Sequence, residues 1–458
     1  MTEIDRADIV IIGAGVVGCA IFRRFAMAGL RPLLLETGDD ILAGASKANS
    51  ALLHTGFDAP PGSLELACMQ AGYREYMEIK ERLNLHVVRS GALVVAWNDE
   101  QMAKLPEIAA KAHQNNVPDV REIDRDELRR REPLLSPKAL GAVLVPGEHI
   151  IDPWSAPLAY VHQGIAHGGR VRRRCRVTDG RYDGIWSLAT TQGVIIAGVV
   201  INAAGTHGDM VEAINRPSPF EIRPRKGQFV VFDKPAAKLL KAIILPVPTE
   251  RTKGIVICRT AFGNVLVGPT AEEQADRDLA EVDRATLEML IDKGIEMLPS
   301  LAGIGVNATY AGLRPATQFK DYQIEALPNR HWITVAGIRS TGLTGSLGIA
   351  QHVAELVNQH FGKLQYDPPI WTPVPNLCEE HPRPYLSPQG GEMVCHCELV
   401  TRSEIETALV GPLPAGSLGG LKRRTRATMG RCQGFYCAAQ VAAIAEGRLK
   451  PAESTANS

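Results

Sequence analysis

The sequence lacks a net charge, long apolar runs and an abundance of aromatic residues, and each absence excludes a class of protein. Its 50 lysines and arginines balance 50 aspartates and glutamates, so no overall field would attract nucleic acid or an anionic membrane surface. Aromatic residues make up only 5% of the chain, which leaves few platforms for stacking bases. No stretch reaches the roughly 18 uninterrupted apolar residues that indicate a membrane span. We therefore expect neither a nucleic-acid-binding protein nor a transmembrane segment.

The first apolar run, residues 9–22, does not have the features of a secretory signal. Three glycines interrupt it, the acidic residues Glu3, Asp5 and Asp8 precede or begin it, and no small-residue cleavage site follows. We expect a cytoplasmic location, where clustered cysteines more often bind metal or do redox work than form disulfides.

The 458 residues are enough for several domains, and the nine cysteines are spread unevenly among them. Cys19, Cys68, Cys175 and Cys258 are scattered and are most simply buried apolar side chains. The other five crowd the C-terminal part of the chain: Cys378, Cys395, Cys397, Cys432 and Cys437.

The N-terminus predicts a strand, a tight turn, a helix and a second strand over residues 7–35. The turn carries the pattern GxGxxG, and Glu36 ends the second strand. Gly13 would make the turn, Gly15 would let the backbone approach a pyrophosphate, and Gly18 would let helix and strand pack closely. Because the acid could accept hydrogen bonds from ribose hydroxyls, the unit predicts a dinucleotide site.

Further segments alternate between the two periodicities. Helices are expected at residues 63–83, 283–298 and 340–361, and strands at 91–97, 171–177, 186–190, 194–203, 228–232, 254–258, 265–267 and 332–337.

A proline-rich linker divides the chain near its end. Seven prolines fall within residues 365–389, a density that favours extended, helix-free chain. We therefore expect a main part at 1–364, a separate module at 390–450 and a tail at 451–458. A module of this size needs a staple such as a metal to hold it together.

The module contains two cysteine pairs, Cys395-His-Cys397 and Cys432 with Cys437, which are separated by four residues. Four thiolates in this arrangement can surround either a zinc ion or a [2Fe–2S] cluster, although C-x-C is less typical of zinc. Basic residues precede the second pair: Lys422, Arg423, Arg424, Arg426 and Arg431. They would either offset the negative charge of a cluster or form a solvated face.

Several separated motifs resemble the D-amino-acid-oxidase-like class of FAD-dependent oxidoreductases. Residues 44–56 look like its second flavin-contacting loop, 199–205 like the strand leading back to the cofactor, and 337–348 like the loop and helix over the isoalloxazine ring. The resemblance covers residues 7–362 and implies an α/β fold, with a Rossmann-type FAD-binding domain and a β-rich substrate domain. It implies FAD contacts at Gly13, Gly15, Gly18, Glu36, Ser46, Asn49, Ser50, Ala204, Gly205, Gly342, Leu343 and Thr344.

On this resemblance we expect both domains to be assembled from separated segments. The FAD-binding parts are expected at about 1–85, 145–215 and 330–364, and the substrate-domain parts at about 86–144 and 216–329.

Within that class, the chain is similar to the glycerol-3-phosphate dehydrogenase A subunits and the L-2-hydroxyglutarate dehydrogenases. Residues 49–54, 60–64 and 91–96 resemble the hydroxyglutarate enzymes, whereas 151–153 and 224–228 look more like the glycerol-phosphate enzymes. Where the latter usually carry Arg-Tyr, this chain has Phe57-Asp58.

The cysteine module resembles the bacterioferritin-associated-ferredoxin-like [2Fe–2S] domain, which often follows a flavin domain of the glycerol-phosphate type. The resemblance implies a small helical domain whose cluster is ligated by Cys395, Cys397, Cys432 and Cys437.

A substrate site needs an anion clamp and a proton acceptor. Arg314 and Arg339 sit where family members place arginines near flavin and substrate, and a guanidinium suits a carboxylate or phosphate. Surface salt bridges are the alternative. His54 is the leading candidate for the base; it could instead be a structural histidine or a covalent attachment point for flavin. Lys226 and Tyr310 are weaker candidates.

Together these features predict an FAD-dependent dehydrogenase that oxidises a C–OH group of a small anion, either glycerol-3-phosphate-like or an L-2-hydroxy acid. Electrons would pass through the [2Fe–2S] cluster to a quinone, an electron-transfer protein or a partner subunit, and peripheral membrane association stays open. The alternatives are oxidation of an amino acid, imino acid or opine by the same fold, and an electron-transfer subunit of a larger complex.

Overall fold

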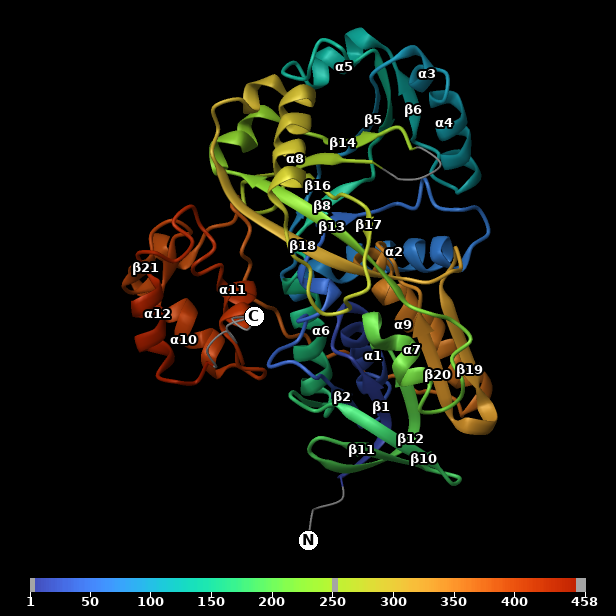
Figure 1. Cartoon of the computed structure of the whole chain (residues 1–458). Coiled ribbons are helices and arrows are strands. Elements are labelled where there is room, and N and C mark those ends of the chain that lie inside the picture. Colours follow the sequence, from blue (N-terminus) through green and yellow to red (C-terminus); the bar gives the residue numbers. More distant parts are fainter. Residues whose placement is uncertain (1–4, 249–253, 450–458) are drawn as a thin grey trace.

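The computed structural model describes residues 5–248 and 254–449. It builds them around two large sheets and a small C-terminal helical unit (Figure 1). In that view the first sheet lies at the bottom, the second at the top and the C-terminal unit at the left. This is the mixed α/β architecture that the sequence predicts.

The first sheet grows from the predicted strand–turn–helix–strand opening. Residues Ile9 and Ile11 of β1 belong to one apolar core, and Val10 and Ile12 belong to another. The strand is therefore buried on both faces, which is typical of a parallel sheet. Its parallel strands run in the order β9 (Arg170–Arg172), β2 (Pro32–Leu35), β1 (Asp5–Ile12), β12 (Gly193–Asn202) and β20 (Trp332–Ala336).

Helices cover one face of this sheet and an antiparallel extension covers part of the other. Phe22 and Phe25, both fully buried, lie at the centre of the helical side, whereas Trp186 and Trp332 pack together on the opposite side. The helices are α1 (Val16–Ala26), α2 (Leu64–Leu83), α6 (Ser155–Ala166) and α9 (Gly342–His360), and the added strands are β10 (Val177–Tyr182), β11 (Trp186–Thr190) and β19 (Gln323–Leu327).

The second sheet is mostly antiparallel. Its order is β17 (Glu272–Glu273), β13 (Arg223–Phe232), β16 (Val265–Gly268), β15 (Val256–Arg259), β14 (Ile243–Pro246), β5 (Ala92–Ala96), β7 (Gly141–Val145) and β6 (Arg121–Ile123), with β18 (Val306–Ala316) also paired to β13. Helix α8 (Arg284–Met297) packs on it through Leu290 and Met297. This sheet is the β-rich part that the sequence predicts.

Short elements connect the two sheets. A three-stranded sheet is formed by β3 (Leu52–Leu53), β8 (His149–Ile151) and β4 (Val87–Val88), and the remaining helices of this part are α3 (Asp99–Met102), α4 (Leu105–Gln114), α5 (Arg125–Arg131) and α7 (Gly208–Glu212).

One expectation about the strands is wrong. The strand predicted at 171–177 is interrupted, because the chain turns back there so that the amides of Arg174 and Cys175 donate to the carbonyls of Gly38 and Glu36 at 3.0 and 2.8 Å. Strand β19 pairs with β20 in the first sheet, so this sheet already includes residues just before the boundary expected near residue 329. The domain bounds themselves stay a prediction.

The C-terminal unit has its own small core. Two short strands, β21 (Met393–Cys395) and β22 (Val400–Thr401), precede three helices, α10 (Arg402–Val410), α11 (Leu418–Thr425) and α12 (Ala438–Ala445). Thr401 and Glu404 form a capping box at the start of α10, which satisfies backbone donors of its first turn. The tail predicted at 451–458 lies outside the described residues. Across the described residues, the helices are too short or too polar for any to cross a membrane.

The proline-rich segment is a strap held against the protein surface. The amides of Asp367, Val374 and Glu379 donate to the carbonyls of Met27, Leu83 and Ala261, at 2.8, 3.2 and 2.9 Å. Cys378 is a free thiol buried within the apolar core of the second sheet. Apart from two single 3₁₀ turns, Pro384–Leu386 and Pro388–Gly390, the strap has no helix.

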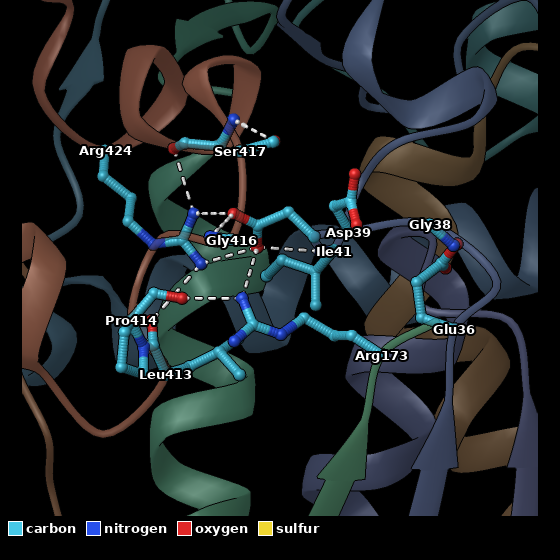
Figure 2. A network of polar contacts seen from close by, with 12 residues as sticks. Glu36, Gly38, Asp39, Ile41, Arg173, Leu413, Pro414, Gly416, Ser417 and Arg424 are labelled. Carbon is cyan, nitrogen blue, oxygen red and sulfur yellow. Dashed lines mark hydrogen bonds and ion pairs between the residues drawn. The ribbon is translucent and has the colours of Figure 1, made fainter. Parts of the chain in front are cut away.

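A buried ion pair docks the C-terminal unit on the first sheet. Asp40, on the loop after β2, accepts hydrogen bonds from both terminal nitrogens of Arg424 at 2.7 and 2.8 Å and from the amide of Gly416 at 3.0 Å. Figure 2 shows Arg424, Gly416 and Arg173 close together at this contact between the C-terminal unit and the first sheet. Arg173 lies 3.8 Å from it and donates to the carbonyl of Pro414 at 2.7 Å.

We expect Arg424→Ala to undock this unit. The side chain of Asp40 is 1% exposed, and a buried carboxylate without its partner costs about 3–5 kcal/mol. Limited proteolysis should then cleave the strap at residues 365–389 many times faster than in the unaltered protein. Arg402→Ala, which removes an exposed ion pair with Glu392, is the matched control. Equal cleavage rates in the two variants would contradict this role of Arg424.

Candidate active site and cysteine cluster

The three glycines of the predicted turn have separate tasks. Gly13 has φ +105°, and a Cβ there would lie 2.6 Å from the carbonyl oxygen of Ala203. A Cβ on Gly18 would lie 1.9 Å from the oxygen of Gly13. Both glycines therefore allow close packing, whereas a Cβ on Gly15 would meet only the Ser46 hydroxyl, at 3.2 Å. Gly15 is the position where a ligand can approach the backbone at the start of α1.

Glu36 is fixed beside this turn. Its carboxylate accepts hydrogen bonds from the amides of Ala14, at 2.9 Å, and Gly38, at 2.8 Å. The Thr37 hydroxyl donates a third bond to it, at 3.3 Å. An ionised carboxylate has about four acceptor sites, so these three bonds leave capacity for one ribose hydroxyl.

The loop after η1 (Ala45–Lys47) is tied to the turn and to the second sheet. The Ser46 hydroxyl accepts from the amide of Val16 at 3.0 Å, and the Asn49 side chain donates to the carbonyl of Ser46 at 3.1 Å. The hydroxyl of Tyr310, on β18, donates to the carbonyl of Asn49 at 2.8 Å. The loop thus bridges α1 and β18.

One cavity brings together segments that are far apart in the sequence. It runs from the start of α1 to β18 and to the loop before α9. Of the predicted site residues, those that line it are Gly15, Ser46, Asn49, Ser50, Gly205, Gly342, Leu343, Arg314 and Arg339. An open helix N-terminus, glycine-rich walls and a nearby acid fit a dinucleotide such as FAD.

The other predicted cofactor residues of the described chain support this lining from behind. Gly13, Gly18 and Glu36 shape the turn, as given above. The amide of Ala204 donates to the Asn202 side chain at 3.3 Å. The Thr344 hydroxyl accepts from the amide of His54 at 3.0 Å and donates to the carbonyl of Leu52 at 3.3 Å. Direct contact of these residues with FAD stays a prediction.

Two guanidinium groups face the same cavity. Arg314 donates to the carbonyl of Thr270 at 2.6 Å, and Gly227 makes room for it, since a Cβ there would lie 2.3 Å from a terminal nitrogen of Arg314. Burial lowers the pKa of Arg314 to about 10, which leaves the group charged at neutral pH. Within the described residues the Arg339 guanidinium has no ion-pair partner, so it is open to an anion.

The two weaker candidates are engaged elsewhere. Lys226 lies 3.1 Å from a carboxylate oxygen of Glu272. Tyr310 is held by the carbonyl of Asn49, and burial raises the pKa of its hydroxyl. Neither arrangement favours a role as the base.

His54 pairs with a residue that the sequence did not single out. Its Nδ1 lies 2.6 Å from a carboxylate oxygen of Glu148, whose side chain is fully buried, while the His54 side chain keeps 24% exposure. His54 is not among the described residues that line the cavity. The Glu148 contact joins positions 94 residues apart, and no local pattern marks it.

The four predicted ligand cysteines lie near one another. Burial raises the pKa of Cys397 and of Cys437, and in both cases the thiols of Cys395 and Cys432 add to the shift. Backbone amides of the following turn, that of Tyr436 first, hold the pKa of Cys432 below its ordinary value. In the described part of the chain, no three His, Cys, Asp or Glu side chains surround the position of a single metal ion. Four neighbouring thiols are a ligand set that suits a [2Fe–2S] cluster.

Most of the basic residues before Cys432 dock the C-terminal unit, so they form neither a solvated face nor a free field around the cluster. Arg424 binds Asp40 and Arg423 donates to the carbonyl of Ile41 at 2.9 Å. Arg426 pairs with buried Glu398 at 2.8 Å and lies 3.9 Å above the ring of Phe262.

Comparisons with known proteins agree with this geometry. Residues 8–356 match the family model described as FAD dependent oxidoreductase, and residues 393–446 match the BFD-like [2Fe-2S] binding domain.

Three relatives illustrate the similarity. A glycerol 3-phosphate dehydrogenase of Caloramator mitchellensis is 30% identical over 95% of this chain and 93% of its own length. An L-2-hydroxyglutarate dehydrogenase of Indibacter alkaliphilus is 28% identical over 58% of this chain and 67% of its own. The FAD-bound structure of an L-α-glycerophosphate oxidase from Mycoplasma pneumoniae superposes with a TM-score of 0.75 at 26% identity, covering 81% of this chain and 100% of its own.

Gly15→Val should abolish tight FAD binding while the fold is kept. The new side chain would occupy the place where the pyrophosphate approaches α1, and Gly15 has an ordinary φ of −69°. We expect FAD content, read from the flavin absorbance of the purified protein, to fall at least about tenfold, a loss of about 1.4 kcal/mol. Gly305→Ala, at a position with open space around it, should keep full FAD. Full FAD in Gly15→Val would refute the assignment.

Serine at any one of Cys395, Cys397, Cys432 or Cys437 should remove the cluster. A missing thiolate leaves one iron short of a ligand, so iron and acid-labile sulfide, measured after anaerobic purification, should fall several-fold or more. Cys378→Ala changes a buried thiol outside the C-terminal unit and should keep both. Zinc without iron or sulfide in the unaltered protein would contradict the cluster.

Proposed function

The chain belongs to the FAD dependent oxidoreductase family, and we propose that it oxidises the C–OH group of a small polyol phosphate, with glycerol 3-phosphate as the first candidate. It is an FAD-dependent dehydrogenase that also carries a [2Fe–2S] domain. The observation that carries the proposal is the pair of guanidinium groups, Arg314 and Arg339, in the cavity lined by the flavin loops. Two planar forks can share the oxygens of one phosphate.

The relatives support a phosphate ester over a carboxylate. Those named for glycerol 3-phosphate are matched over 93% and 100% of their own lengths, and the one named for L-2-hydroxyglutarate over 67%. An L-2-hydroxy acid is the second candidate, because its carboxylate could bind the same two arginines. No feature of this structure favours oxidation of a C–N bond. The fold alone does not support it, because one fold serves many substrates.

Each residue has a distinct task in the proposed reaction. Arg314 and Arg339 hold the anionic end of the substrate, which orients its hydroxyl-bearing carbon. His54 accepts the proton of the substrate hydroxyl at Nε2 as the C–H bond breaks. FAD, when bound, supplies the acceptor for the hydride, and the cluster carries the electrons onward one at a time.

The electron acceptor is proposed to be a quinone, an electron-transfer protein or a partner subunit. A cluster would be redundant in an oxidase, where oxygen can reoxidise the flavin directly. Its presence in the same chain favours an acceptor that takes single electrons.

Anaerobic mixing with single substrates tests the proposal. Glycerol 3-phosphate should bleach the flavin absorbance, and Arg339→Ala should raise the KM for it at least about tenfold, because a charge-assisted contact is worth about 1.5–3 kcal/mol. Arg223→Ala, which removes an exposed arginine paired with Glu221, should leave KM unchanged. If L-2-hydroxyglutarate or an amino acid bleaches the flavin and glycerol 3-phosphate does not, the proposed substrate class is wrong.

A further inference from the structure

A short antiparallel pairing brings His54 and Glu148 together. Strand β3 ends at Leu53, β8 begins at His149, and these two residues lie opposite each other in the register. The residues that flank them, His54 and Glu148, therefore meet just beyond the paired segment. The backbone of His54 is fixed from another side, because its amide donates to the Thr344 hydroxyl of α9 at 3.0 Å.

Glu148 has both carboxylate oxygens occupied. Oε1 accepts from the amide of Thr55 at 2.6 Å and from its hydroxyl at 2.9 Å, and Oε2 contacts Nδ1 of His54 at 2.6 Å. A fully buried carboxylate is costly unless donors surround it, and Thr55 supplies two donors, both to Oε1. An ionised carboxylate only accepts hydrogen bonds, so Nδ1 must carry the proton in the neutral ring.

We propose that Glu148 is the positioning residue that holds His54 in the Nδ1–H tautomer and turns Nε2 into the proton acceptor of the reaction. The inference rests on the proposed role of His54 as base and adds the residue that sets its tautomer and orientation. In hydrolytic triads and metal sites, likewise, the hydrogen bond made by one ring nitrogen of a histidine decides whether the second nitrogen carries a proton.

Further polar and charged groups lie beside Glu148. The hydroxyl of Tyr73 donates to the carbonyl of Gly147 at 2.8 Å, and its ring lies 6.2 Å from that of His149. Arg89 acts on both Tyr73 and His149 through its charge, and Asp119 acts on Tyr73. These groups are the same in a Glu148 variant, so any change in the pH profile reports on Glu148.

Glu148→Gln tests the tautomer directly. The amide of Thr55 needs an acceptor, so the glutamine oxygen should take the place of Oε1 and its NH₂ group should face Nδ1. The ring would then carry its proton on Nε2 and could not accept one from substrate. We expect kcat to fall about 10²–10⁴-fold with KM changed less than about threefold. The acidic limb of the kcat/KM profile should move to lower pH, because an anion that favours the imidazolium is gone.

Nitrogen-15 NMR of the holoenzyme labelled at histidine supplies a readout that does not depend on turnover. His54→Asn identifies the signal. The unaltered protein should show the Nδ1–H form, and Glu148→Gln the Nε2–H form. Tyr73→Phe, which removes a neighbouring bond but keeps the carboxylate, should retain the Nδ1–H form and kcat within about threefold.

Three results would overturn the inference: an Nε2–H ring in the unaltered holoenzyme, an unchanged tautomer in Glu148→Gln, or unchanged kcat in that variant. The first does not depend on Glu148→Gln, so it stands even if that variant does not fold. Failure of the proposed base is a separate result, because it would appear as full turnover in His54→Asn whatever the tautomer.

Discussion

The buried carboxylate of Asp40 joins the first sheet to the C-terminal unit. It lies on the loop that follows Glu36, and this loop has two attachments. At one end Glu36 accepts the amide of Ala14 in the glycine turn, and the amide of Leu42 donates to the carbonyl of Ala14 at 2.9 Å. Between these two anchors, Asp40 holds Arg424 and Gly416 of the C-terminal unit. Because a charge this deeply buried is stable only with its partners, one loop shapes the dinucleotide turn and seats the iron–sulfur domain. The proposed sites for the two cofactors are thereby held in one body.

In the proposed substrate site, too, one element has two tasks. Strand β18 supplies Arg314 to the cavity and Tyr310 to the carbonyl of Asn49, so the sheet that would bind substrate also fixes the loop that would touch the flavin. The small residue Gly227 leaves space for the guanidinium. The backbone thus places the charge of Arg314 and the loop of Asn49 where substrate and flavin would lie. Such placement is what a protein contributes when its cofactor supplies the redox chemistry.

Local patterns predicted the parts of the molecule that local chemistry determines. The glycine turn with Glu36 is a closely spaced pattern, and so is each of the motifs Cys395-His-Cys397 and Cys432 to Cys437. The structure brings the residues of the turn together and the two cysteine motifs near each other. Contacts set by distant pairing could not be predicted. Glu148 meets His54 only through the register of β3 and β8, and β18, whose sequence contains Gly312 and Pro315, lacks the alternation of a strand. The sequence showed Arg424 only as one of several basic residues before Cys432, because its partner Asp40 lies 384 residues away.

In the proposed reaction, one chain takes electrons from a small anionic alcohol and delivers them to its own cluster. Low-temperature EPR of the holoenzyme, frozen at intervals after anaerobic mixing with glycerol 3-phosphate, can follow this transfer. We expect the signal of the reduced [2Fe–2S] cluster to grow as the flavin absorbance bleaches, with no other protein present. Complete bleaching with a cluster that stays oxidised, although dithionite reduces it, would contradict this electron path.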